Sequence, residues 1–152
     1  MFTGRELLIA VLASGVTVAA TAGIRTAAPV LSSSIFDWNS MKVETTNVGA
    51  RRTVFRSPTA TLDELECHIT TLNPGQSSHL PHRHPEEEIL IVREGTVESL
   101  VNGNLQRVGP GSVIFQASNQ EHSIRNVGDT PATYHVFSWK SPGMAAKIHG
   151  TP

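Results

Sequence analysis

From Lys42 onward the chain is built of short apolar segments separated by turn residues, and this pattern restricts the fold more than any other feature. The turns are indicated by Pro58, Asn73-Pro74-Gly75, Gly109-Pro110-Gly111 and Gly128-Asp129-Thr130-Pro131. No stretch between them has the apolar period of an amphipathic helix. The predicted strands are Lys42–Thr46, Arg51–Arg56, Leu62–Leu72, Glu88–Arg93, Thr96–Val101, Leu105–Val108, Ser112–Phe115, His122–Asn126 and Ala132–Trp139. This spacing is typical of an all-β sandwich or closed barrel and predicts a small jelly roll.

Composition agrees with one small domain. The chain has 152 residues, of which 39% are hydrophobic and 16% charged, so it can bury a single core. Its formal net charge is -1 and it has no basic stripe, which argues against a nucleic-acid partner. The single cysteine, Cys67, excludes an internal disulfide framework. It shares parity with Leu65 and Ile69, which predicts a buried core thiol; the alternative is a redox-active or cavity-lining thiol.

Residues 1–28 differ from the rest of the chain. The apolar run Leu7–Ala13 continues through small residues to Ala22, and Ala20-Thr21-Ala22 matches the small residues that a signal peptidase reads. We therefore expect a secretory signal peptide, with an uncleaved membrane anchor as the alternative, and a periplasmic or secreted domain in either case. No stable membrane span is expected unless this segment stays uncleaved.

The predicted organisation after that segment has three parts. Residues 29–41 form a Pro/Ser-rich linker whose Phe36 and Trp38 could pack on the barrel. Residues 42–142 form the β-barrel domain, and residues 143–152 form a C-terminal tail.

Histidines and a carboxylate at strand spacing indicate a metal site. In an extended segment His82 and His84 point to the same side, and Glu88 shares their parity once Pro85 has turned the chain. His122 opens another predicted strand after a turn and supplies the fourth ligand. The predicted metal ligands are therefore His82, His84, Glu88 and His122. The alternative is a set of surface histidines, or residues retained only for structural hydrogen bonds.

Other nearby residues are interpreted differently. Glu86 and Glu87 are expected to form a solvated acidic turn, because their spacing does not suit ligation. His79 is expected to be a polar loop residue, and the alternative is that it lines the mouth of the cavity. There is no motif support for His68, His135 or His149.

At these residues the chain resembles the cupin family, as a small single-domain cupin of the Cupin_2 type. The first family motif reads here as His82-x-His84-x3-Glu88-x6-Gly95, with Gly75 one residue too far upstream. The second reads as Gly111-x5-Ala117-x-Asn119-x2-His122-x3-Asn126, with Ala117 in place of the family's proline and Asn119 in place of its glycine. Asn119 is a residue type that tolerates left-handed backbone geometry. The resemblance covers roughly residues 62 to 139. It implies a double-stranded β-helix, the four ligands above, and a homodimer paired through Lys42 to Arg56.

Three imidazoles and one carboxylate suit one divalent transition metal ion, and Mn, Fe, Ni, Zn and Cu all remain open. Four protein ligands around an octahedral ion leave two positions for a small molecule. The resemblance implies a dioxygenase, decarboxylase, isomerase or lyase acting on a small oxygen-rich molecule. A non-catalytic binding or sensing domain, and a domain that the metal only stabilises, are the alternatives.

No catalytic residue can be assigned from the sequence. The candidates for an acid or base are Glu98, Gln116, Tyr134 and His135, and Arg93 and Arg107 are expected to point outward rather than bind a carboxylate.

Overall fold

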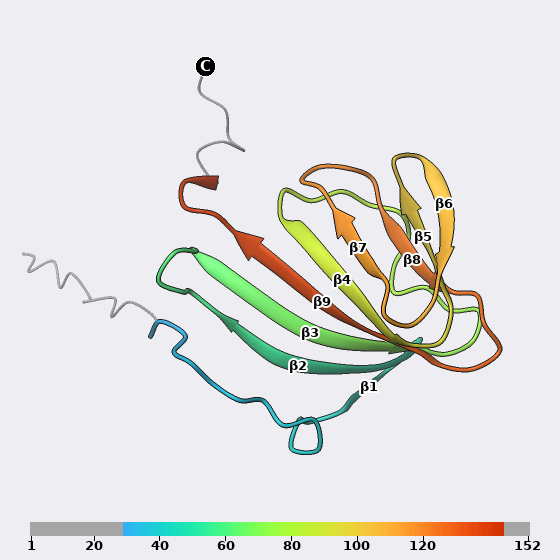
Figure 1. Ribbon diagram of the computed structural model, residues 1–152, viewed down its shortest axis with the longest axis horizontal. Helices are drawn as coiled ribbons and strands as arrows, with labels where there is room; N and C mark the ends of the chain where they lie inside the picture. The colour runs from blue at the N-terminus through green and yellow to red at the C-terminus, as the bar shows by residue number, and fades with distance from the viewer. Residues whose placement is uncertain (1–28, 145–152) are drawn as a thin grey trace, which may run out of the picture.

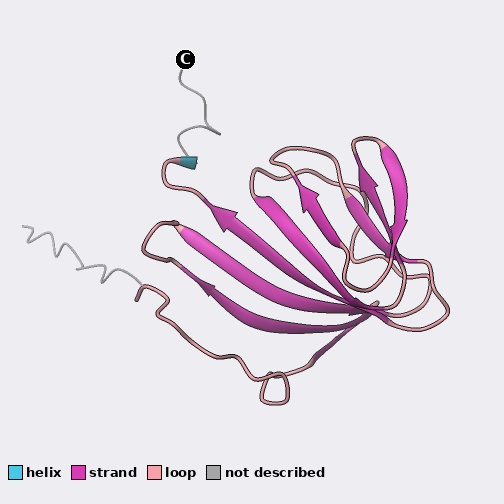
Figure 2. Cartoon of the chain, viewed as in Figure 1, coloured by secondary structure: helices cyan, strands magenta, loops and turns pink. Residues whose placement is uncertain are grey.

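Nine β-strands form two antiparallel sheets in the computed structural model, which describes residues 29–144 (Figures 1 and 2). The strands are β1 (Glu44–Thr46), β2 (Gly49–Ser57), β3 (Glu64–Leu72), β4 (Glu87–Glu94), β5 (Val97–Val101), β6 (Asn104–Val108), β7 (Val113–Gln116), β8 (Ser123–Asn126) and β9 (Ala132–Lys140). The larger sheet has the order β1-β2-β3-β9-β4-β7, and the smaller has the order β6-β5-β8. All nine predicted strands are present, and their ends lie within two residues of the predicted ends.

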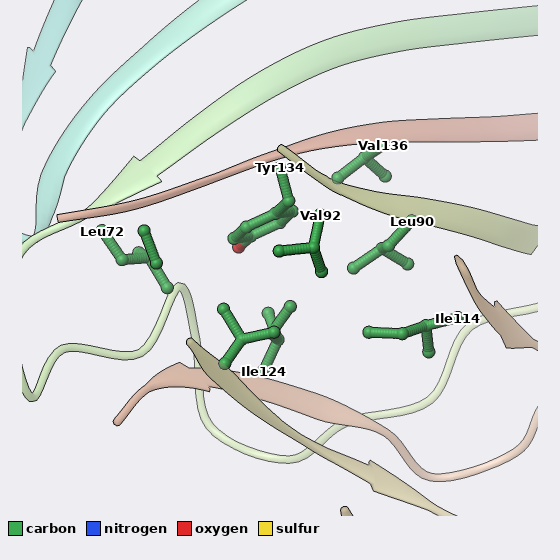
Figure 3. Close-up of a cluster of buried hydrophobic side chains, with 9 residues drawn as sticks. Leu72, Leu90, Val92, Ile114, Ile124, Tyr134 and Val136 are labelled. Carbon is green, nitrogen blue, oxygen red and sulfur yellow. The ribbon is translucent and has the colours of Figure 1, made fainter. Parts of the chain in front are cut away.

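The core lies between the two sheets. Alternate residues of β4 and β9, such as Leu90, Val92, Tyr134 and Val136, point inward and pack together with residues of the other strands (Figure 3). These side chains are almost completely buried, and Tyr134 is 1% exposed. This alternation places the apolar residues of β4 and β9 on the inside, where they join one continuous core.

Two turns have the left-handed backbone that the sequence predicts. Asn102 and Gly103 join β5 to β6 with φ angles of 51° and 75°, as a two-residue hairpin turn requires. Asn119, at the position of the family's glycine, has a φ of 58°. The loss of that glycine therefore leaves the local turn geometry intact.

The segment before β1 packs on the outer face of the larger sheet. The Phe36 ring lies 5.2 Å from the Phe55 ring, and the Trp38 ring is covered by the guanidinium groups of Arg52 at 4.3 Å and Arg93 at 3.6 Å. The expected packing of these two aromatic residues on the barrel is confirmed.

Cys67 lies opposite Phe55 in the β2–β3 ladder and is 2% exposed. Burial, followed by the nearby charge of Glu66, raises the pKa of the thiol to about 12. The prediction of a buried core thiol is confirmed. Cys67 does not line the cavity described below, so the alternative of a cavity-lining thiol is wrong.

The predicted signal peptide lies outside the described residues, as does most of the predicted C-terminal tail. Among residues 29–144 there is no helix long and apolar enough to cross a membrane. The domain boundaries at residues 29, 42 and 143 and the homodimer stay predictions.

Candidate metal centre

Two loops that are distant in sequence meet at a short backbone bridge. The amide of His82 donates to the carbonyl oxygen of His122 over 3.1 Å, and the amide of His122 donates to the carbonyl oxygen of His82 over 3.0 Å. The amide of Asn119 also donates to the carbonyl oxygen of His84, at 2.8 Å. These three bonds hold the two motif segments together through the backbone alone, and this brings the histidine side chains side by side.

The three histidines of the predicted ligand set form one cluster. One ring nitrogen from each of His82, His84 and His122 lies within 4.8 Å of the other two. The ring centroids are 4.5 Å apart for His82 and His122, 4.7 Å for His84 and His122, and 5.2 Å for His82 and His84. When a ring nitrogen binds an ion at about 2.1 Å, the ring centroid lies roughly 3.2 Å from the ion. The separations above therefore correspond to angles of roughly 90–110° between two ring centroids, measured at such an ion. The cluster therefore has the dimensions of a site for one metal ion.

Backbone carbonyls set the protonation of two of these rings. Nδ1 of His84 donates to the carbonyl oxygen of Glu86 at 3.1 Å, and Nδ1 of His122 donates to that of Gln120 at 2.8 Å. A neutral ring whose Nδ1 carries the proton has a lone pair on Nε2, the form that binds metals. Nε2 of His122 is buried and has no hydrogen-bond partner among the described residues. A divalent ion would satisfy this atom, so the residues fit the predicted metal.

Burial favours the neutral form of two rings in the cluster, those of His82 and His122. Burial lowers the pKa of His82, and the neighbouring histidines His79, His122 and His84 lower it further. Burial also lowers the pKa of His122 and outweighs the opposing effect of its hydrogen bond to Gln120. Both rings are therefore unprotonated near neutral pH, which is the state required for coordination.

The carboxylates around His84 differ in position. Oε1 of Glu88 lies 3.5 Å from Nε2 of His84, on the side of the metal-binding nitrogen, but Glu88 is outside the group of mutually close ligand atoms. Oε2 of Glu86 lies 3.4 Å from Nδ1 of the same ring, on its opposite side. Glu87 lines a separate hollow with Pro85 and Trp139. The assignment of Glu88 as the fourth ligand stays a prediction, and Glu86 is placed to orient His84.

A cavity of about 360 Å³ opens beside the cluster. His82, His84 and Glu88 line one part of it, and the core residues Leu90, Ile124 and Val136 line another. The volume is sufficient for a small ligand next to a metal ion. His79 also lines the cavity, with its ring centroid 3.9 Å from that of His82, so the structure favours the alternative of a cavity-lining residue over the expected role as a polar loop residue.

Only two of the four candidate acid or base residues reach this cavity. Gln116 and Tyr134 line it, and burial raises the pKa of Tyr134 to about 12, so its hydroxyl stays protonated. Glu98 forms an ion pair with Arg107 at 3.0 Å, and the ring of His135 lies 6.5 Å from that of Trp38, on the outer face.

The two arginines considered for carboxylate binding do not line the cavity. Arg93 covers Trp38 and Arg107 pairs with Glu98, as expected for outward-pointing side chains.

Arg51 and His68 line the cavity, but sequence reasoning did not select them. Both contact Glu66, which is 3% exposed inside the barrel. A usable signal was present on β3, where Glu66 and His68 lie on the same face of the strand as Thr70 and Leu72. Charged residues on the same face as a buried leucine indicate an internal polar site.

The fold and the site together define a small antiparallel β-barrel whose interior holds a histidine cluster beside a ligand-sized cavity. The Cupin_2 family, described as a cupin domain, matches residues 68–138. This chain therefore contains a small cupin domain, as the resemblance implied.

The chain is similar to proteins of several kinds. It is 28% identical to the L-ectoine synthase of Halomonas elongata over 84 residues, which are 54% of this chain and 58% of that protein. The chain thus matches less than two thirds of that relative's length. A predicted oxalate decarboxylase from Thermotoga maritima has a TM-score of 0.58 and 21% identity, over 70% of this chain and 99% of that one. An RmlC-like cupin from Shewanella frigidimarina has a TM-score of 0.59 and 16% identity, over 72% and 94%. At these identities the solved structures show a shared fold.

Proposed function

We propose that this protein is a metal-dependent enzyme that converts a small oxygen-containing molecule bound in the barrel cavity. The observation that carries the proposal is the position of the histidine cluster at the wall of the cavity, with the buried Nε2 of His122 lacking a partner among the described residues. A divalent metal bound by His82, His84, His122 and Glu88 would supply a Lewis acid to polarise an oxygen of the substrate.

The relatives favour a decarboxylase or lyase type over the other options. The curated relative is named as a synthase, and one protein of the same fold is named as a predicted oxalate decarboxylase. An oxygenase stays within the proposal, because an open site with three histidines also suits redox metals. Export to the periplasm or the cell exterior is part of the proposal and rests on the sequence of residues 1–28.

A binding or sensing domain that does not turn its ligand over is the second candidate. It is favoured because, of the acid or base candidates, those that line the cavity are Gln116, an amide, and Tyr134, whose hydroxyl stays protonated. A purely structural metal is less well supported, because a site that only stabilises a barrel does not need a cavity of about 360 Å³ beside it.

The proposal is tested by the metal content of the protein purified from its native compartment, and of a His82→Ala/His122→Ala double variant. His135→Ala is the matched control, because it removes a histidine from the outer face. Near-stoichiometric metal that is lost in the double variant and kept in the control supports the proposal. Turnover of a small organic acid by the metal-loaded protein then identifies the enzyme, whereas reversible binding without product identifies the binding domain. Absence of metal from the wild type under every loading condition would overturn the metal-dependent function.

A further inference from the structure

Part of the cavity wall apart from the metal cluster is polar and charged. Arg51 on β2 and His68 on β3 line this part together with Thr70. Burying such groups in a barrel interior costs free energy, because each loses its hydration and needs a hydrogen-bonding partner. Their presence beside the apolar core requires a specific compensating arrangement.

That arrangement centres on Glu66. Nη2 of Arg51 donates to Oε1 of Glu66 at 3.1 Å, and Nδ1 of His68 lies 2.8 Å from Oε1 and 3.0 Å from Oε2. The hydroxyl of Ser138 donates to Oε2 at 3.4 Å. Both oxygens of the buried carboxylate are therefore used by protein donors, and Glu66 itself presents no free acceptor to a ligand.

The charge state of Glu66 is consistent with this role. Burial works against ionisation of the carboxyl group, but the hydrogen bond from His68 and the charges of His68, Arg51 and Arg56 hold its pKa below the usual value. Glu66 is therefore an anion at neutral pH, and it fixes His68 in the tautomer that carries a proton on Nδ1.

Arg51 keeps unused donors. A guanidinium group has five N–H donors in a planar fork, and only Nη2 is bonded to Glu66. Nε of Arg51 is buried and has no hydrogen-bond partner in residues 29–144, although the side chain as a whole is 43% exposed. Nε of Arg52 on the outer face is in the same state, so this atom alone does not indicate a ligand. The donors that can meet a ligand in the cavity are the N–H groups on the exposed part of the Arg51 guanidinium.

We propose that Arg51, oriented by the buried Glu66, forms a carboxylate-binding subsite in the cavity, apart from the histidine cluster. The planar carboxylate of a small organic acid would accept from the free N–H groups of Arg51, in the two-bond geometry that guanidinium groups favour. Glu66 is a positioning residue in this arrangement, and it does not contact the ligand.

The charges favour a carboxylate over a phosphate. Glu66 already offsets much of the charge of Arg51, and Glu88 adds a negative charge to the same cavity. A singly charged group is therefore better matched than a doubly charged one. The assignment of a substrate rests on the proposed metal-dependent function. If that function holds, the substrate is a small acid with its carboxylate at Arg51 and a second oxygen near the metal.

The test uses malonate as the probe, with malonamide as its uncharged counterpart, on the metal-free and the metal-loaded full chain. We expect the metal-free protein to bind malonate and not malonamide, and Arg51→Gln to weaken malonate binding about tenfold or more. Arg52→Gln is the matched control, since its guanidinium is on the opposite face of the same strand against Trp38, and it should change the affinity by less than about twofold. Glu66→Gln should weaken binding and alter the Nδ1–H resonance of His68.

Each outcome decides the inference separately from the proposed function. Equal malonate affinity in Arg51→Gln and Arg52→Gln, or binding of inorganic phosphate as tight as malonate, would overturn the carboxylate subsite. Arg51-dependent malonate binding in a protein that never takes up metal would support the subsite while the proposed metal function fails. If Arg51→Gln does not fold, the Nε–H resonance of Arg51 in the wild type serves instead, assigned by its loss in Arg51→Lys. It should shift on addition of malonate and stay unchanged on addition of malonamide.

Discussion

His82 and His122 are joined by two backbone hydrogen bonds, with N–O distances of 3.1 and 3.0 Å, and their rings lie 4.5 Å apart. The backbone thus brings the two side chains together, and the hydrogen bond from Nδ1 of His122 to the carbonyl oxygen of Gln120 orients one of the rings. In consequence the site is organised before any ion binds, and removal of a single ring should leave the surrounding structure in place.

The first prediction concerns the ligands. His84→Ala or His122→Ala should lower the affinity for Zn²⁺ or Mn²⁺ by more than about 100-fold, because loss of a ligand costs more than loss of an outer-shell partner. The far-UV circular dichroism should stay that of a β protein. Competition with a chromophoric chelator measures the affinity, and His135→Ala provides the control. Unchanged affinity in His122→Ala would remove this residue from the ligand set.

The second prediction separates the two glutamates that flank His84. Glu88→Gln should weaken metal binding strongly, because Glu88 lies on the side of Nε2. Glu86→Gln should have a small effect, since Glu86 contacts Nδ1 and the backbone carbonyl still accepts from that atom. The same chelator competition compares the two variants. The opposite ranking would mean that Glu86 is the carboxylate ligand.

The third prediction concerns Asn126, the last residue of the second motif, which the structure places away from the histidines. It is 0% exposed, and its Nδ2 donates to the carbonyl oxygens of Leu72 and Thr130 at 2.9 and 2.8 Å. Asn126→Ala leaves both carbonyls unpaired and should lower the free energy of unfolding by roughly 2–4 kcal/mol.

Asn104→Ala is the matched control for Asn126, because its Nδ2 bonds one carbonyl at the exposed hairpin turn. Asn104→Ala should lower the free energy of unfolding by less than about 0.5 kcal/mol. Urea denaturation measures both variants, and similar midpoints would contradict a stabilising role for Asn126.

The strands and the shared facing of His82 and His84 were predictable because both depend on local information. Turn chemistry at Asn102-Gly103 and the parity of His82 and His84 are properties of a few adjacent residues. The meeting of His82 with His122 needs a long-range pairing, and it followed from the resemblance to cupins rather than from periodicity.

The polar part of the cavity wall was not predicted, because it depends on the register between strands. Arg51 and Arg52 are adjacent, yet one faces the cavity and the other faces Trp38. Adjacent residues of a strand face opposite sides, and the pairing of Arg51 with Thr70 on β3 decides which of the two faces the cavity. No local pattern reveals that pairing. The same limit left the inward position of Tyr134 and the outward position of His135 undecided.

The fourth prediction compares two glycines with similar backbones. Gly95 and Gly75 have φ angles of 81° and 76°, so alanine is strained by about 1–2 kcal/mol at either position. A Cβ at Gly75 meets nothing within 4 Å, whereas a Cβ at Gly95 would lie 2.6 Å from the Cα of Ala132. Gly95→Ala should therefore destabilise the fold by at least twice as much as Gly75→Ala, measured by urea denaturation. Equal destabilisation would show that backbone strain alone determines the requirement for glycine at Gly95.

The last prediction concerns acid stability and Glu66. Because the pKa of Glu66 is lower in the folded protein than its ordinary value of 4.5, the ionised group stabilises the fold above that pH. This contribution should be lost as the pH falls below about 4.5 toward the folded pKa, since the unfolded chain then binds the proton more readily. Glu66→Gln should show a weaker decline in unfolding free energy over this window than the wild type. Glu94→Gln, which removes an exposed carboxylate, should follow the wild-type slope. Urea denaturation at a series of pH values between about 3 and 6 checks this, and parallel curves for the wild type and Glu66→Gln would mean that the network of Glu66, His68 and Arg51 does not hold the carboxylate in its ionised form.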